Sequence, residues 1–213
     1  DYEKVLIHGV NVFNYLNMNE LDNALTVVRR LNNMLYKFKY EAKKDYEQNP
    51  FAFYLSAILF EASKDWDSAY IEYKKAFEVA PNYSPLKEDL IRAAIKAHRS
   101  DDAQDWQKRF PEIKIKPEWK DPSYGEIVLV YQQGWGPRKG PRPDAPRYPQ
   151  LNPVYSYTQF AKLIIGEQSL VTQSIFSVQD VAIKTLNNDY AALVAGRVAG
   201  VVAKAVVADQ IRQ

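Results

Sequence analysis

The sequence contains no cysteine and only two histidines, His8 and His98, among its 213 residues. The lack of cysteine excludes disulfides, a thiol nucleophile and any zinc or iron–sulfur site built on thiolate ligands. Two histidines are too few for most histidine-rich metal centres. The formal net charge is only +2, so no strong electrostatic attraction to nucleic acid is expected. These counts favour a protein that works without a metal, a cofactor or nucleic acid.

Long apolar runs are also absent. A membrane-spanning helix needs roughly 18 apolar residues in a row, and the nearest candidate, residues 190–208, is interrupted by Arg197 and Lys204. The chain starts without a basic and apolar leader segment, and both of its ends already follow helical patterns. We therefore expect a soluble, ordered portion of a longer protein.

Proline is scarce before position 110 and frequent after it. Three prolines precede that position, whereas six lie between residues 137 and 153 alone. Because a proline inside a helix costs about 3 kcal/mol, the first half can form continuous helices and residues 111–153 cannot. The sequence predicts two domains, a helical one at residues 1–115 and a smaller one at residues 116–213.

The first half repeats a helix–turn–helix pattern. Ala69 and Ala103 are 34 residues apart, and each follows an apolar helical stretch and a short polar turn. Ala24 has the same surroundings 45 residues before Ala69, so the second helix of the first unit should be about three turns longer. A unit of about 34 residues is typical of tetratricopeptide (TPR) repeats. The apolar ladder expected to lengthen that helix consists of Leu31, Leu35, Phe38, Ala42 and Tyr46.

The second half changes to strand-like patterns. Residues 125–133, GEIVLVYQQ, begin with glycine and are rich in β-branched and aromatic residues, which predicts a strand. Residues 134–153 combine glycines, prolines and basic residues, which predicts an extended arm without regular structure. Two apolar runs joined by Gly166 and Glu167 predict a β-hairpin.

Two helices are expected after the hairpin. The first begins after Ser177 as N-cap, with Asp180 three residues further on, and the second runs from about Asp189 to the end. The predicted fold class is α+β, with N-terminal TPR-like α-helical hairpins followed by a small α+β domain of about three strands and two helices. Gly196 and Gly200 in the last helix permit close packing, either within the core or between subunits.

Several of these segments resemble a largely uncharacterised family of bacterial envelope proteins that contain TPR repeats and are predicted lipoproteins. The resemblance covers roughly residues 2–140, and it implies export and anchoring at the outer membrane through a lipidated cysteine upstream of this chain. It implies a location in the periplasm or at the outer membrane, and it implies no catalytic residues. The segments that carry it are FAFYLSAILFEASKDWDSAYIEYKKAFEVAP, LKEDLIRAA, WQKRFP and GEIVLVYQQGWGP, in this order.

TPR units bind partners on the concave face, which the first helix of each pair lines. An apolar groove there would accept an amphipathic helix or an extended segment, unless the second half of the same chain fills it. The sequence lacks the Lys/Asn set with which some TPR domains hold a C-terminal carboxylate. The predicted lining residues are Phe13, Leu16, Phe51, Tyr54 and Ile58.

The proline-rich arm is the second candidate for partner binding. A pre-extended basic segment loses little entropy when it docks on an acidic or aromatic partner, although a solvated loop is equally consistent with the composition. The run GWGPRKGP does not fit a phosphate loop, because its prolines remove backbone N–H donors. The residues of the arm that we expect to contact a partner are Trp135, Arg138, Lys139, Arg142 and Arg147.

The hypothesis from the sequence is a non-enzymatic scaffold subunit of a bacterial cell-envelope assembly, such as a secretion or surface machine. Its partners would be other envelope proteins, bound through the TPR face and the arm, and the assembly could be a large oligomer. The alternative is an envelope hydrolase or ligand-binding protein with a site between the two halves, near Glu126, Tyr131 and Trp135.

Overall fold

The computed structural model describes residues 2–41, 48–121 and 123–212. Their contacts divide the chain into two units, which alternate along the sequence. Unit one consists of residues 1–133 and 158–177, and unit two of residues 134–157 and 178–213. The expected boundary between residues 115 and 116 concerns independent folding, so it stays a prediction.

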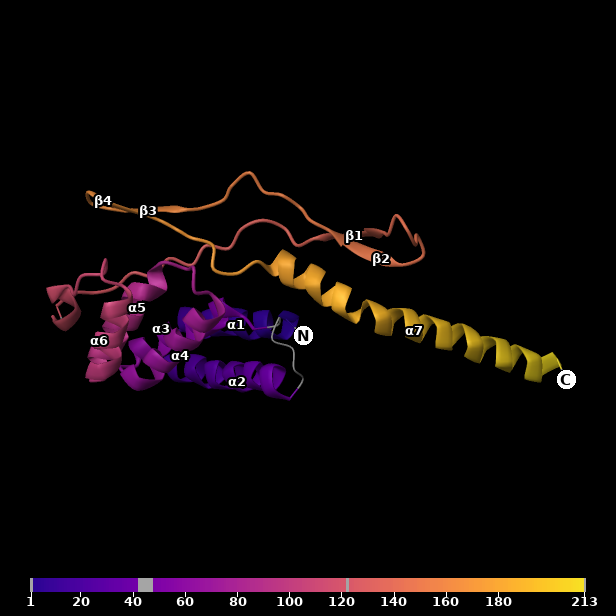
Figure 1. Ribbon diagram of the computed structural model, residues 1–213, viewed down its shortest axis with the longest axis horizontal. Helices are drawn as coiled ribbons and strands as arrows, with labels where there is room; N and C mark the ends of the chain where they lie inside the picture. Colours follow the sequence, from indigo (N-terminus) through magenta and orange to yellow (C-terminus); the bar gives the residue numbers. More distant parts are fainter. Residues whose placement is uncertain (1, 42–47, 122, 213) are drawn as a thin grey trace. The chain divides into compact units, whose positions relative to one another are not determined.

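Six helices form the first part of unit one, and we call them the helical array (Figure 1). Each helix packs against the next one along the chain, so that the helices form pairs. This arrangement confirms the α+β class with N-terminal helical hairpins. The six helices are α1 (Tyr2–Asn17), α2 (Leu21–Tyr40), α3 (Pro50–Ala62), α4 (Trp66–Val79), α5 (Pro85–Lys96) and α6 (Ser100–Arg109).

The turns inside the three helix pairs share one geometry. Asn19, Lys64 and His98 all have positive φ, at 62°, 63° and 57°. The backbone N–H of the next residue donates to the carbonyl five residues earlier in every turn, at 2.9 Å. This is the Schellman motif, which ends a helix by satisfying its last carbonyls. The turns are 45 and 34 residues apart, which is the spacing of the three alanines and confirms the helical repeat.

Small residues lie where the repeat pattern places them. Ala24 and Ala69 are fully buried and Ala103 nearly so, at the positions where paired helices approach each other. Helix α2 has 20 residues against 14 in α4, in agreement with a longer second helix in the first pair. The last two members of its predicted ladder, Ala42 and Tyr46, lie outside the described residues.

The boundaries of α3 follow from local chemistry. The Asn49 side chain accepts a hydrogen bond from the Ala52 backbone at 3.1 Å, and Pro50 occupies the first helical turn, where its missing N–H costs nothing. After the array, the short 3-10 helix η2 (Pro117–Lys120) buries Trp119 against the helical core. This contact attaches the start of the second half to the array.

The segment predicted as a strand, residues 125–133, is extended but pairs with no described strand. That prediction was wrong because β-branched composition favours extended backbone, whereas a strand also needs a hydrogen-bonded neighbour. The predicted hairpin is confirmed further on. Strands β3 (Lys162–Ile165) and β4 (Gln168–Val171) pair antiparallel, and Gly166 turns between them at a φ of 57°.

Unit two holds a second hairpin and one long helix. Strands β1 (Arg138–Pro141) and β2 (Pro149–Asn152) pair antiparallel, so the expectation of an arm without regular structure was wrong. A two-stranded ribbon has two edge strands, and proline is tolerated there because the N–H it lacks would point outward. Gly140 lies close to the opposite strand, because a Cβ there would be 2.7 Å from the Asn152 side-chain nitrogen, which would have to move.

The two expected C-terminal helices are a single helix, α7 (Val178–Arg212), of 35 residues. The break predicted near Asp189 does not occur because no proline interrupts the segment, and a glycine inside a helix costs only about 1 kcal/mol. The described part of the chain after the array therefore has four short strands and one helix, against the three strands and two helices expected. None of the described helices is both long enough and apolar enough to cross a bilayer.

Candidate functional site

The residues predicted to line the concave face are only partly available to a partner. Phe13 and Phe51 stack on each other with ring centroids 6.4 Å apart, and both pack against the core. Ile58 is half-buried and Leu16 is exposed. Tyr54 belongs to a different arrangement, because its ring packs edge-on against Tyr73 and its hydroxyl is held by a buried charge. The aromatic residues of the predicted lining therefore pack as part of the core.

Three carboxylates of unit one form ion pairs with a single arginine of the array, Arg92 of α5. Its Nη2 lies 3.0 Å from Glu61 Oε2 and 3.0 Å from Asp89 Oδ1. Its Nη1 lies 2.7 Å from Glu126 Oε2. One buried cation thus holds three carboxylates, two from helices α3 and α5 and one from the extended segment. We call these four residues, with Tyr54 and Tyr73, the Arg92 cluster.

Two tyrosines complete the hydrogen bonding of the helix-borne carboxylates. The Tyr73 hydroxyl donates to Glu61 at 2.7 Å, and the Tyr54 hydroxyl donates to Asp89 at 2.9 Å. The Nε of Arg92 is buried and finds no acceptor among the described residues. Buried donors are normally satisfied, so this Nε is an exception in a cluster whose other polar groups are paired.

Burial and excess negative charge shift the ionisation of the cluster. Burial raises the pKa of Asp89 to about 7, against the opposing effect of Arg92 and the Tyr54 hydrogen bond. Burial likewise raises the pKa of Glu61. Glu126 adds to both shifts, because a third carboxylate disfavours the charged form of its neighbours. Asp89 is therefore the group of the cluster that takes up a proton near neutral pH.

Sequence reasoning missed Arg92, Asp89 and Glu61. A usable signal exists in α5, where Asp89 and Arg92 are three residues apart and stand among the buried residues Leu90, Ile91 and Ala93. Charged residues at core positions of a helix are rare unless they are paired, so this spacing predicts a buried ion pair. The sequence around Arg92 gives no sign of its third partner, Glu126, which lies 34 residues further along the chain.

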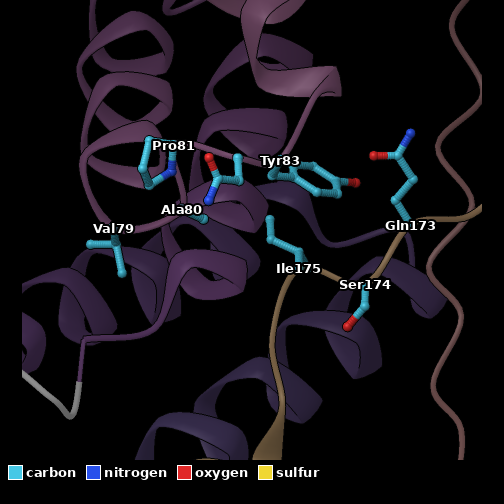
Figure 2. A pocket seen from close by; sticks show the side chains of 8 residues that line it. Val79, Ala80, Pro81, Tyr83, Gln173, Ser174 and Ile175 are labelled. Carbon is cyan, nitrogen blue, oxygen red and sulfur yellow. The ribbon is translucent and has the colours of Figure 1, made fainter.

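A shallow hollow lies where the chain crosses back over the turn between α4 and α5 (Figure 2). Tyr83 and Pro81 line one side, and Gln173, Ser174 and Ile175 the other. Its volume of about 250 Å³ is below the range of roughly 300–1,000 Å³ usual for small-molecule sites. The Ser84 hydroxyl donates to the Gln173 side chain at 3.0 Å across this crossing, so we interpret the hollow as a contact between chain segments.

The arm residues lie in unit two and are partly engaged there. Trp135 is 81% exposed, and Arg138 and Lys139 are exposed on β1. Arg142 pairs with Asp144 at 3.1 Å, and its guanidinium lies 4.3 Å from the Tyr190 ring of α7. The Arg147 backbone carbonyl accepts a hydrogen bond from the Arg197 side chain. Arg147 therefore also connects the hairpin to α7. Arg142 thus contributes to holding the hairpin on the helix.

The described residues contain no group of three or more metal-ligating side chains suited to a metal ion. Of the alternative site near Glu126, Tyr131 and Trp135, the structure shows Glu126 bound to Arg92 and the other two side chains exposed. Comparison of the chain with protein-family models, with curated proteins and with solved structures finds no match in any of the three.

Proposed function

We propose that this protein is a non-enzymatic interaction subunit of a bacterial cell-envelope assembly. The observation that supports it is a set of large apolar side chains exposed along segments with little packing. Monomeric proteins rarely leave contiguous apolar surface of more than a few hundred Å² uncovered, so these segments favour contact with other proteins. In unit one they are Ile127, Val128, Leu129, Tyr131, Phe160, Ile164, Ile165, Leu170 and Val171, and in unit two Trp135, Tyr155 and Tyr157.

The paired helices of the array support the same proposal. Helical repeats present extended surfaces whose usual use is protein binding. The envelope location within the proposal is supported by the resemblance of residues 2–140, and the partners would be other envelope proteins.

The proposal is tested by co-purification from envelope extracts at matched expression. The full chain is compared with a variant lacking residues 134–153 and with the variant I127S/L129S, which makes the exposed apolar segment polar. We expect defined partner proteins with the full chain and fewer with both variants. If the full chain retains the same proteins as an unrelated control, the proposal is wrong.

The enzymatic or ligand-binding alternative has its own measurement. A ligand that binds only the folded protein raises its melting temperature, so a thermal-shift screen of envelope metabolites and peptides would reveal such a ligand. A reproducible shift that the substitution Glu126→Gln abolishes would favour the alternative.

A further inference from the structure

Residues 124–131, which we call the strap, form an extended segment that contacts the array while burying little of itself. Ile127 is 64% exposed and Leu129 is 42% exposed, and only Val130 is half-buried. The polar contact that joins the strap to the helices is the ion pair between Glu126 and Arg92, at 2.7 Å. Among the described residues, the strap therefore lies on the array with most of its side chains exposed and with the Glu126–Arg92 ion pair as its charged contact.

The docking site on the array is more permanent than the strap that fills it. Arg92 is fixed by Glu61 and Asp89, which are themselves held by tyrosine hydroxyls. Its Nη1 is the donor directed at the strap, and the Glu126 side chain there is 48% exposed. Ion pairs with a partner this exposed contribute little to stability, so the strap can leave without disturbing the array.

The linker before the strap sets how far it can travel. Trp119 is buried in the array, and Glu126 lies seven residues after it. An extended chain covers about 3.3 Å per residue, so Glu126 can reach at most about 23 Å from Trp119. This reach includes the surface of a second molecule that lies against the array.

From this arrangement we infer that the strap exchanges between copies, so that Glu126 of one molecule binds Arg92 of the next. The occupant of the site is a second copy of this chain, because the strap already has the charge and the extended form that the site accepts. Exchange of an identical element is a common route to oligomers, and here it runs head to tail.

This inference goes beyond the proposed function, because self-association requires no other envelope protein. Concentration decides between the two arrangements. A short linker gives the strap of the same chain an effective concentration in the millimolar range, so docking within one molecule prevails in dilute solution. Docking between molecules increases as the protein concentration rises toward that range, as it does for proteins confined to a surface.

The absence of cysteine makes the test clean, because introduced cysteines are the sole thiols. One copy, the strap copy, carries Ile127→Cys beside the intact Glu126. A second copy, fused to a tag of different mass, carries Lys96→Cys, one helical turn after Arg92 and facing Glu61. The mixed copies are treated with a short bismaleimide at protein concentrations from about 1 µM to about 500 µM, which approach the millimolar range of the linked strap. A single chain with both substitutions reports docking within one molecule.

We expect a mixed product whose yield rises with concentration. Adding Glu126→Gln to the array copy, which carries Lys96→Cys, weakens the strap that competes for its Arg92. The yield should then rise up to about fivefold, since an exposed ion pair contributes up to about 1 kcal/mol. By contrast, Glu118→Gln, an exposed neutralisation on η2, should leave the yield unchanged. Sedimentation of the cysteine-free protein should show a mass that rises over the same range. Product confined to the doubly substituted chain, or a yield that does not depend on Glu126 of the array copy, would overturn the inference. Circular dichroism of each variant verifies that the helices are intact.

Discussion

The helical array and the segments that follow it differ in where their stability comes from. The described buried apolar side chains lie almost entirely between Val5 and Trp119, and beyond Trp119 Ala182 of α7 is the single one. The array therefore has a hydrophobic core, whereas the two hairpins depend on backbone pairing and a few surface contacts. Isolated two-stranded hairpins are marginally stable in water. The difference teaches that the two parts of the chain depend on different interactions for their stability.

Loss of Arg92 should have the largest effect on the array. Arg92→Ala leaves Glu61 and Asp89 buried without their cation, and breaking a buried pair in this way costs about 3–5 kcal/mol in the free energy of unfolding. The measurement is urea unfolding followed by region-resolved hydrogen exchange. Arg142→Ala in unit two is the matched control, and the exchange of the array should stay as in the wild type. A loss confined to residues 123–133 would mean that Arg92 serves only to hold the strap.

A matched pair of leucines compares the two regions directly. Leu90 is fully buried in α5 and Leu170 is 61% exposed on β4. We expect Leu90→Ala to cost about 2–5 kcal/mol through the lost burial and the cavity, and Leu170→Ala to stay within about 0.5 kcal/mol. The measurement is thermal unfolding of both variants, compared with the wild type. Equal losses would show that the β3–β4 hairpin is part of the core in solution.

The pH dependence of stability should come from the array. Because the pKa of Asp89 is about 7 in the folded chain, against an ordinary value near 4, the folded state binds the extra proton. The free energy of unfolding therefore falls as the pH rises from about 4 to about 7, by at most about 1.4 kcal/mol for each pH unit. Asp89→Asn removes this proton uptake and should flatten the profile.

The readout is the melting temperature at pH 5 and at pH 8. The wild type should melt lower at pH 8, and the difference should shrink in Asp89→Asn. Asp144→Asn is the control, since Arg142 lowers the pKa of that carboxyl and its site lies in unit two. A wild-type protein that melts higher at pH 8 would contradict the assignment of the proton to Asp89.

The smallest effect concerns the helix starts. Asn49→Ala removes a side-chain cap of α3 and should cost about 1 kcal/mol. Ser84 precedes α5 without capping it, and its hydroxyl instead reaches Gln173. Ser84→Ala should therefore leave the melting temperature of the array unchanged while it increases hydrogen exchange around residue 173. An equal loss in both variants would mean that the crossing at Gln173 stabilises the array.

The helical half was predictable because its information is local. Alanines at a fixed spacing, polar turns and a capped proline at Pro50 specify helix pairs through short-range rules. The hairpin around Gly166 was predictable for the same reason. The pairing of β1 with β2 was not predictable, because the prolines in these segments suggest irregular backbone. They are tolerated because both strands of a two-stranded ribbon are edge strands.

The candidate site was less predictable than the fold. Phe13, Phe51 and Tyr54 were correctly placed on the first helices of their pairs, but the sequence could not show that these rings would pack on their neighbours. The contact of Glu126 with Arg92 joins residues far apart in the chain, and no periodic pattern encodes it. Helix α7 continues through Asp189 because no strong helix breaker lies there. The absence of a breaker is a weak signal in a sequence, and the polar residues around Asp189 suggested a turn instead.

The three Schellman turns have a consequence for protein engineering. Asn19, Lys64 and His98 each adopt a left-handed backbone conformation that glycine adopts at no steric cost. For residues with a Cβ this conformation costs about 1–2 kcal/mol. Substitution by glycine should gain less than this in stability, because glycine also makes the unfolded chain more flexible. The array therefore contains three equivalent positions, at the turns inside its helix pairs, where its stability can be adjusted. Lys64→Gly and His98→Gly would give a graded set of more stable variants of the helical array.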